Sequence, residues 1–366
     1  MRSRVAALAA CLIMSGCTPR SPLGTSALSP PSTPAAPAPS ASATAAAGIS
    51  RSWVPVPGLS GDHMWERGLN DVTAAGPERA WAIGHTGWED SETTVLRTWD
   101  GKRWKAVPIE GGLGGLASVD SDGPRNAWIV SGGFHESMAQ HWDGYTWRPH
   151  RLPTYGLDLA VDGRRVVVIS KNTVLTWNGA AFVTEKALGG EEVNLTAVDS
   201  GAGHTWIAGR RGQDAGRPVI WHGHDGGYEE TTLPEGELNA ILQIAPDDVW
   251  VVGCVGRDGN GGERPLALHW NGRRWERPTI PSWRGELQSV TAFGPDDVWF
   301  AGLDRDGPGA ISVLHWDGRS WTTEVPPPGG EGQQAVIERI PGTSRLWLTV
   351  NVAKGDSQSI VTYRRE

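Results

Sequence analysis

The chain has 366 residues, of which 33 are basic and 41 are acidic, and its formal net charge is −8. This acidic balance argues against nucleic acid as a partner and against electrostatic docking on anionic lipid. Twenty Trp, 49 Gly and 26 Pro, with little helical periodicity, favour an all-β fold of short strands joined by many turns.

Residues 1–17 are predicted to be a lipoprotein signal peptide. Arg2 and Arg4 form a basic start, and the apolar stretch that follows is too short to span a bilayer. Residues 14–17 then read MSGC, which resembles the lipobox of bacterial lipoproteins, with Met14 where Leu is usual. The resemblance implies that Cys17 is acylated and that the membrane is a partner through this lipid, on its extracytoplasmic face. An ordinary secretory signal that is cut nearby is the alternative.

Residues 18–50 consist mainly of Pro, Ser, Ala and Thr and carry almost no charge. Such a segment cannot bury enough apolar surface to fold, so we expect a disordered tether. Cys11 leaves with the signal peptide and Cys17 is the lipid site, so Cys254 is the only other thiol. The exported chain is therefore expected to form no internal disulfide and to depend on burial for stability.

A first repeated signature is a turn followed by a short strand with a Trp. It reads GPERAW at 76–81, GPRNAW at 123–128, APDDVW at 245–250 and GPDDVW at 294–299. With weaker copies, the signature ends at positions 81, 128, 167, 206, 250, 299 and 347, where Val replaces Trp at 167. The spacing of 39 to 49 residues is typical of four-stranded propeller blades.

A second signature follows each first one. It reads WDGKRW at 99–104, WDGYTW at 142–147, WNGRRW at 270–275 and WDGRSW at 316–321, with diverged copies at 177–182 and at Trp221 with Tyr228. Asp-Gly and Asn-Gly between apolar runs predict a hairpin in which both turn residues take positive φ. Each unit is therefore expected to contain four strands.

The seventh unit ends one strand short, at residues 359–363, and residues 51–57 at the other end resemble the fourth strand of a unit. We therefore expect residues 51–366 to form a seven-bladed β-propeller closed by the N-terminal strand, with blades that bury each other's Trp side chains. A β-sandwich with a Trp core is the alternative, but it does not explain the regular repetition.

The two signatures resemble propeller repeats of the kelch and galactose-oxidase kind, and most closely the Trp-rich repeats of secreted actinobacterial proteins. The kelch double glycine is mostly single here, at Gly84, Gly253 and Gly302. The resemblance covers nearly all of the chain after residue 51 and implies a fold rather than a function.

Three Trp residues fall outside the repeat strands: Trp65, Trp88 and Trp283. Their spacing from the repeat Trp places all three on one face of the propeller, the face that carries the loops from blade to blade and the loops between second and third strands. We name it the upper face. Aromatic rings there are candidates for ligand binding, although they could instead cover the central channel.

Charged residues are expected on the same face, among them Glu237, Glu286, Arg67 and Arg284. Carboxylates and guanidinium groups beside aromatic rings suit a glycan, peptide or protein ligand. The favoured function is a cell-surface binding or scaffolding module that is expected to act as a monomer. The alternatives are a propeller glycoside hydrolase or lyase, sialidase-like and acting on extracellular carbohydrate, and a structural part of an envelope complex.

His141, His269 and His315 each precede a Trp of the second signature. Because they belong to three different blades, their spacing opposes a shared metal site and favours hydrogen bonding within or between blades. No metal, cofactor or catalytic residue is predicted.

Overall fold

The chain divides into two compact units, Met1–Ala46 and Ala47–Glu366. The computed structural model describes residues 52–59, 67–86, 93–108, 115–131, 137–212, 216–256, 262–307, 310–327, 331–354 and 357–366, all in the second unit. The signal peptide, the lipid site and the tether lie outside these residues. Within them, no helix is long and apolar enough to cross a membrane.

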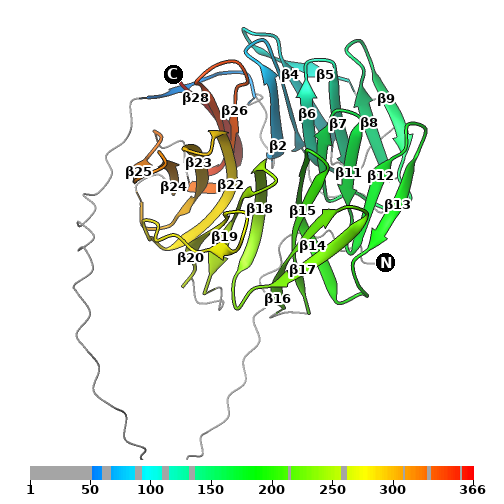
Figure 1. Ribbon diagram of the computed structural model, residues 1–366. Coiled ribbons are helices and arrows are strands. Elements are labelled where there is room, and N and C mark those ends of the chain that lie inside the picture. The colour runs from blue at the N-terminus through cyan, green and yellow to red at the C-terminus, as the bar shows by residue number, and fades with distance from the viewer. Residues whose placement is uncertain are drawn as a thin grey trace, which may run out of the picture. The chain divides into compact units, whose positions relative to one another are not determined.

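The described residues form seven antiparallel sheets of four strands each, numbered here as blades 1 to 7 along the chain (Figure 1). Blade 1 contains β2 (Arg67–Gly76), β3 (Arg79–Thr86), β4 (Thr93–Trp99) and β5 (Trp104–Val107). Blade 2 contains β6 (Leu116–Gly123), β7 (Asn126–Ser131), β8 (Met138–Trp142) and β9 (Trp147–Arg151). Blade 3 contains β10 (Asp158–Asp162), β11 (Arg165–Ile169), β12 (Thr173–Trp177) and β13 (Phe182–Ala187).

The remaining blades follow the same pattern. Blade 4 contains β14 (Val193–Gly201), β15 (His204–Arg211), β16 (Arg217–His224) and β17 (Gly227–Thr232). Blade 5 contains β18 (Glu237–Ala245), β19 (Asp248–Val255), β20 (Arg264–Trp270) and β21 (Trp275–Glu276). Blade 6 contains β22 (Gly285–Gly294), β23 (Asp297–Asp304), β24 (Ile311–Trp316) and β25 (Trp321–Glu324). Blade 7 contains β26 (Glu331–Arg339), β27 (Leu346–Lys354), β28 (Ser357–Arg365) and, from the other end of the chain, β1 (Trp53–Pro55).

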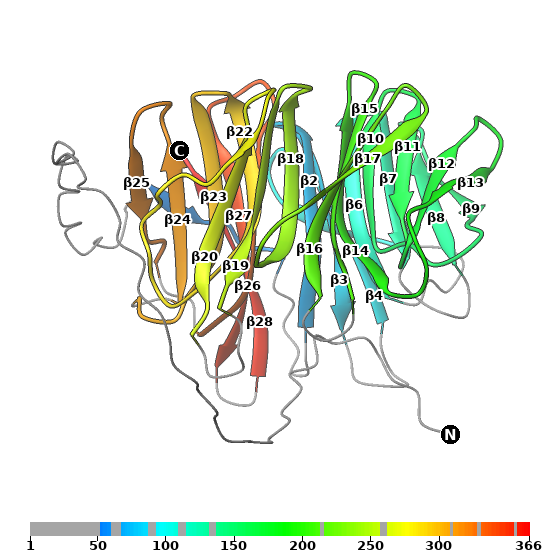
Figure 2. The same ribbon diagram turned by 60° about the horizontal axis from the view of Figure 1, so that its bottom comes forward.

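The N-terminal strand closes the ring, as the sequence predicts. Strand β1 pairs antiparallel with β28, with Trp53 opposite Arg365, and lies beside the red strands of blade 7 in Figure 1. The Trp53 side chain is 2% exposed, and its Nε1 donates to Glu324 Oε2 of blade 6 at 2.9 Å. The innermost strands touch in the cyclic order β2, β6, β10, β14, β18, β22, β26 and again β2, so each blade packs between two others. Figure 2 shows the blades from a second direction.

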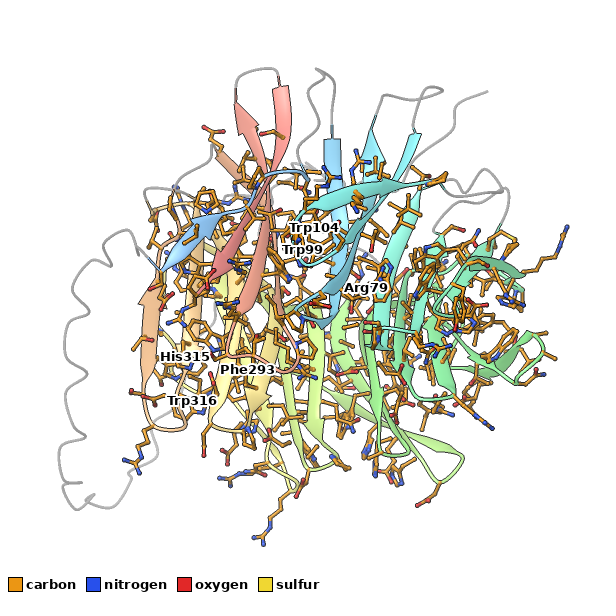
Figure 3. All side chains as sticks on the ribbon, turned by 90° about the horizontal axis from the view of Figure 1, so that it is seen from above. Arg79, Trp99, Trp104, Phe293, His315 and Trp316 are labelled. Atoms are coloured by element: carbon orange, nitrogen blue, oxygen red, sulfur yellow. The ribbon has the colours of Figure 1, made fainter. Side chains whose placement is uncertain are left out.

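The hydrophobic core consists of seven clusters, one between each pair of neighbouring blades. At the seam between blades 7 and 1, Trp99 meets Trp347 edge to face with centroids 5.0 Å apart, and Trp104 lies 5.6 Å from each of them. Trp99 and Trp104 are labelled in Figure 3. Edge-to-face pairs of this kind stabilise beyond the area that they bury. The expectation that the blades bury each other's Trp side chains is confirmed.

The Asp-Gly hairpins differ from the expected geometry. Only the glycine takes positive φ, +89° at Gly101, and the loop between the paired Trp99 and Trp104 has four residues. The Asp100 side chain explains this, because its Oδ1 accepts hydrogen bonds from the backbone N–H groups of Lys102 and Arg103. This side-chain turn stabilises the loop with a single residue at positive φ.

In blade 4 the diverged second signature, Trp221 with Tyr228, does not have the strand pairing of the other blades. Gly223 lies opposite Tyr228, whereas Trp221 lies opposite Glu230. Gly223 therefore holds the position that Trp occupies in blades 1, 2, 3, 5 and 6, and blade 4 departs from the repeat at this end.

Candidate functional site

The candidate residues of the upper face are only partly within the described residues. Trp65 and Trp88 lie outside them, and Arg67 begins β2 with a side chain that is not described. Trp283 is 9% exposed and packs in the cluster between blades 5 and 6, where its Nε1 donates to Leu303 O at 2.6 Å. Its indole therefore supports the start of β22 rather than presenting an open ring to solvent.

Arg284, next to Trp283, is exposed and held by an aspartate of the same blade. Its backbone N–H donates to Asp306 Oδ2 at 2.8 Å, and its Nε lies 3.3 Å from Asp306 Oδ1. An exposed ion pair of this kind contributes little stability, so its charges can be redirected to a ligand at small cost.

Glu237 is the first residue of β18 and Glu286 is the second residue of β22, so both lie at the same end of the innermost strands of neighbouring blades. Both side chains are half-buried. Glu286 Oε2 accepts from Asn239 Nδ2 of blade 5 at 3.2 Å, and Glu286 Oε1 accepts from Gln288 Nε2 at 3.0 Å. The structure thus surrounds one predicted site residue with two amides that the sequence analysis missed.

These amides also bind backbone groups of the next blade. Asn239 Nδ2 donates to Leu287 O at 2.8 Å, and Gln288 Oε1 accepts from the backbone N–H of Ala335 in blade 7 at 2.8 Å. Asn239, Glu286 and Gln288 therefore form a fixed polar cluster across blades 5, 6 and 7, which we name the mouth cluster. It holds both carboxylate and amide groups at the upper end of the innermost strands.

A recurring β-bulge positions the mouth cluster. The register of the innermost strand shifts by one residue in six blades, which leaves Asn239 unpaired in blade 5 and Gln288 unpaired in blade 6. The bulge pushes a carbonyl toward the second strand, so a Cβ at Gly253 would lie 1.8 Å from Glu237 O. The single glycines Gly84, Gly253 and Gly302 all face such a carbonyl. They were the feature of the sequence from which the bulge could have been predicted.

Farther along the same strands, five carboxylates from five blades line the axis: Asp71, Asp120, Asp158, Asp199 and Glu338. Loss of hydration raises the pKa of Asp71 and of Asp199 to about 7 and that of Glu338 to about 8. It also raises the pKa of Asp158, and that of Asp120 well above its usual range. Repulsion between carboxylates of different blades also raises these pKa values. The side chains therefore share one enclosed region.

Four of these carboxylates cap the free edge of a neighbouring sheet. Asp120 Oδ2 accepts from the backbone N–H of Val161 at 2.7 Å, and Asp71, Asp158 and Asp199 do the same for Val119, Val198 and Gln243. The inner edge of each blade has N–H groups without a strand partner, and an unpaired buried N–H is costly. These four buried acids therefore have a structural role in the ring.

One hydroxyl joins two of these acids. Ser118 Oγ lies 2.9 Å from Asp71 Oδ2 and 2.7 Å from Asp158 Oδ1, but it has only one proton to donate. Both contacts can be hydrogen bonds at the same time when one of the two carboxyl groups carries a proton and donates it to Ser118 Oγ. This agrees with the raised pKa of both acids.

The predicted role of the repeat histidines is confirmed. Each stacks on the first-signature Trp of its blade and hydrogen-bonds a side chain two residues before that Trp. His141 Nε2 lies 2.9 Å from Asn126 Oδ1, and His269 and His315 lie 2.8 Å from Asp248 Oδ1 and Asp297 Oδ1. In Figure 3, His315 is seen beside Trp316 on β24. Within the described residues, no three His, Cys, Asp or Glu side chains are arranged to hold a metal ion as they stand.

No model of a known protein family matches the sequence, and no curated protein matches it. Solved structures match the fold. A structure of YCF48 bound to D1 peptide is 15% identical with a TM-score of 0.56, covering 87% of this chain and 97% of that one. A streptogramin B lyase is 13% identical with a TM-score of 0.62, covering 86% of this chain and 99% of that one.

A third match is a catalytically inactive variant of virginiamycin B lyase from Staphylococcus aureus, solved with quinupristin. It is 12% identical with a TM-score of 0.61, covering 86% of this chain and 98% of that one. At this level of identity the matches establish the fold alone, and the chain is a seven-bladed β-propeller similar to these proteins in architecture.

Proposed function

We propose that this protein is a lipid-anchored binding or scaffolding module of the cell surface, whose ligand is a peptide or protein segment lying across the upper face. The observation that carries the proposal is the mouth cluster. Glu286, Asn239 and Gln288 come from two blades and bind a third, so carboxylate oxygens and amide groups are held in fixed positions beside the propeller axis. Preorganised polar groups of this kind suit a ligand with many backbone donors and acceptors.

The acids of the axis support binding over catalysis. A perturbed pKa marks a candidate active site, but Asp71, Asp120, Asp158 and Asp199 each accept a backbone N–H of the next blade. A carboxylate used as a structural cap is poorly placed to exchange protons with a substrate. The YCF48 structure with its peptide supports a peptide ligand, since it is a propeller of the same architecture.

The negative charge of the chain narrows the class of peptide that it could bind. The chain carries a net charge of −8, and Glu237 and Glu286 lie at the start of adjacent innermost strands. A peptide with Lys or Arg side chains complements this surface and is expected to associate faster at low salt.

The test is a peptide array, with glycans spotted on the same surface, probed with the wild-type chain and with variants. Glu286→Ala and Asn239→Ala should weaken binding to basic peptides by about tenfold or more, as loss of a central polar contact does. Arg319→Ala, in the exposed hairpin at the opposite end of blade 6, is the control and should bind normally. Glycan binding without peptide binding, or equal binding by all variants, would contradict the peptide proposal.

The anchor is tested separately through Cys17. Wild-type protein expressed in a bacterial host should incorporate labelled fatty acid and fractionate with the membrane, because acyl chains contribute roughly 0.8 kcal/mol per buried CH₂. Cys17→Ala should be unlabelled and leave the membrane fraction. An unlabelled wild-type protein would leave the binding proposal standing but remove its lipid anchor.

A further inference from the structure

Blade 4 carries three histidines at the lower end of β15 and β16: His204, His222 and His224. His204 Nδ1 lies 2.8 Å from His222 Nε2, and the ring centroids of His222 and His224 are 4.6 Å apart. His222 also stacks on Trp206, with centroids 3.7 Å apart. Glu229 lies opposite His222 in the strand register and approaches His224 Nε2 to 3.6 Å with Oε1.

Comparison with the other blades shows that this cluster departs from the repeat at two positions. His222 matches His141, His269 and His315, which stack on the Trp of their blades in the same way. Their partners are Asn126, Asp248 and Asp297, and in blade 4 this position holds His204. The hairpin position that holds Asp in blades 1, 2 and 6 and Asn in blades 3 and 5 holds His224. Two oxygen-bearing side chains are thus replaced by imidazoles around a third imidazole that the repeat already supplies.

The separations of the ring centroids are close to those of imidazoles that share one ion. Zn–N bonds of about 2.0–2.1 Å at tetrahedral angles place ligand nitrogens about 3.3 Å apart and ring centroids about 5 Å apart. The centroid separations here are 5.0, 5.8 and 4.6 Å. The His204 and His222 nitrogens, which share a proton at 2.8 Å, would need to separate by about 0.5 Å.

The chemistry of the rings is also suitable. Metal ligation requires neutral imidazole. The N–H···N contact needs at least one neutral ring, and ligation moves its proton to the other nitrogen of the same imidazole. His224 is 31% and Glu229 is 77% exposed, so an ion can reach the cluster from solvent.

We propose that His204, His222 and His224, with Glu229 as a fourth ligand, bind one zinc ion or a similar divalent transition-metal ion on the lower end of blade 4. The donor atoms do not surround a common point as they stand. The site therefore forms when the shared proton shifts and the exposed His224 and Glu229 side chains rotate inward. Bound metal would join the third strand of the blade to the second and the fourth.

The test uses the full chain after treatment with a chelator. Titration with Zn²⁺ should show one equivalent bound, and Co²⁺ should give the visible absorption of a tetrahedral nitrogen and oxygen site. His204→Asn recreates the pair of Asn126 and His141, so this variant should fold normally. It should lose Zn²⁺ affinity by roughly tenfold or more, because changing a residue that only supports a metal ligand already costs about 10–100-fold. His85→Asn removes a histidine from another blade and should bind as wild type.

Three results would overturn the proposal. The first is no stoichiometric Zn²⁺ binding by the wild-type chain. The second is equal affinity in wild type and His204→Asn. The third is a near-ultraviolet thiolate band with Co²⁺, which would assign the metal to a cysteine. Unfolding of His204→Asn is measured without metal as well, and a midpoint close to that of wild type separates loss of a ligand from loss of the fold.

Discussion

Asp199 in blade 4 accepts a hydrogen bond from the backbone N–H of Gln243 in blade 5, with 2.7 Å between Oδ2 and N. Its other oxygen accepts from the backbone N–H of Ser200. One side chain therefore fixes its own strand and the edge of the next blade. The same arrangement recurs at Asp71, Asp120 and Asp158, so the ring is held by carboxylates near its axis and by Trp clusters farther out.

Removing one of these caps should destabilise the whole ring. We expect Asp199→Ala to lower the free energy of unfolding by about 1–3 kcal/mol, because it leaves a buried N–H without a partner. Asp296→Ala, in an exposed turn of blade 6, is the matched control and should change the free energy by less than about 0.5 kcal/mol. Denaturant unfolding at pH 5 measures both. Equal stabilities would show that the edge groups find other partners.

Glu338 should make stability depend on pH. Its pKa is about 8 in the folded chain and near 4.5 when unfolded, so the folded form holds the proton more tightly. This contribution is fully present below about pH 4 and is lost as the pH rises toward 8. We expect Glu338→Gln to match wild type at pH 4 and to melt several degrees higher at pH 9, since it has no charge to bury. Identical melting curves across this range would contradict the assignment.

The bulge of the innermost strand should not tolerate a side chain on the neighbouring strand. Gly253→Ala would place its Cβ 1.8 Å from Glu237 O, so the strands must separate. We expect a loss of several kcal/mol of stability, and weaker ligand binding because Asn239 moves with the bulge. Gly123→Ala is the control, because nothing lies within 4 Å of its Cβ. Thermal unfolding that is unchanged by Gly253→Ala would refute this explanation of the repeat glycines.

The number of blades and the closure of the ring could be predicted from the sequence, because both depend on local sequence signals that recur. Each Trp signature fixes a strand by its turn and its burial, and the missing fourth strand of blade 7 could be matched to residues 51–57. The hairpin turn type was missed, because Asp100 stabilises its loop by side-chain hydrogen bonds that a dipeptide preference does not describe.

The candidate site was harder to predict. The axial acids and the mouth cluster arise from side chains that bind the next blade, about 40 to 48 residues away in the chain, as Asp120 binds Val161 and Gln288 binds Ala335. No local pattern marks such a contact. The burial of Trp283 was missed as well, because its ring packs in the cluster between blades 5 and 6 and its Nε1 donates to Leu303 O, 20 residues along the chain.

The most direct test of the account is the closing strand, which connects the proposed anchor to the ring. Trp53 is buried between blades 6 and 7, and loss of a buried Trp alone costs about 3–5 kcal/mol. Removal of every residue before Gly58 should therefore lower the thermal midpoint sharply, whereas deletion of residues 18–48 should leave it nearly unchanged. If the chain that begins at Gly58 melts at the same temperature as the chain that keeps Trp53, closure by the N-terminal strand does not stabilise the propeller and the account is wrong.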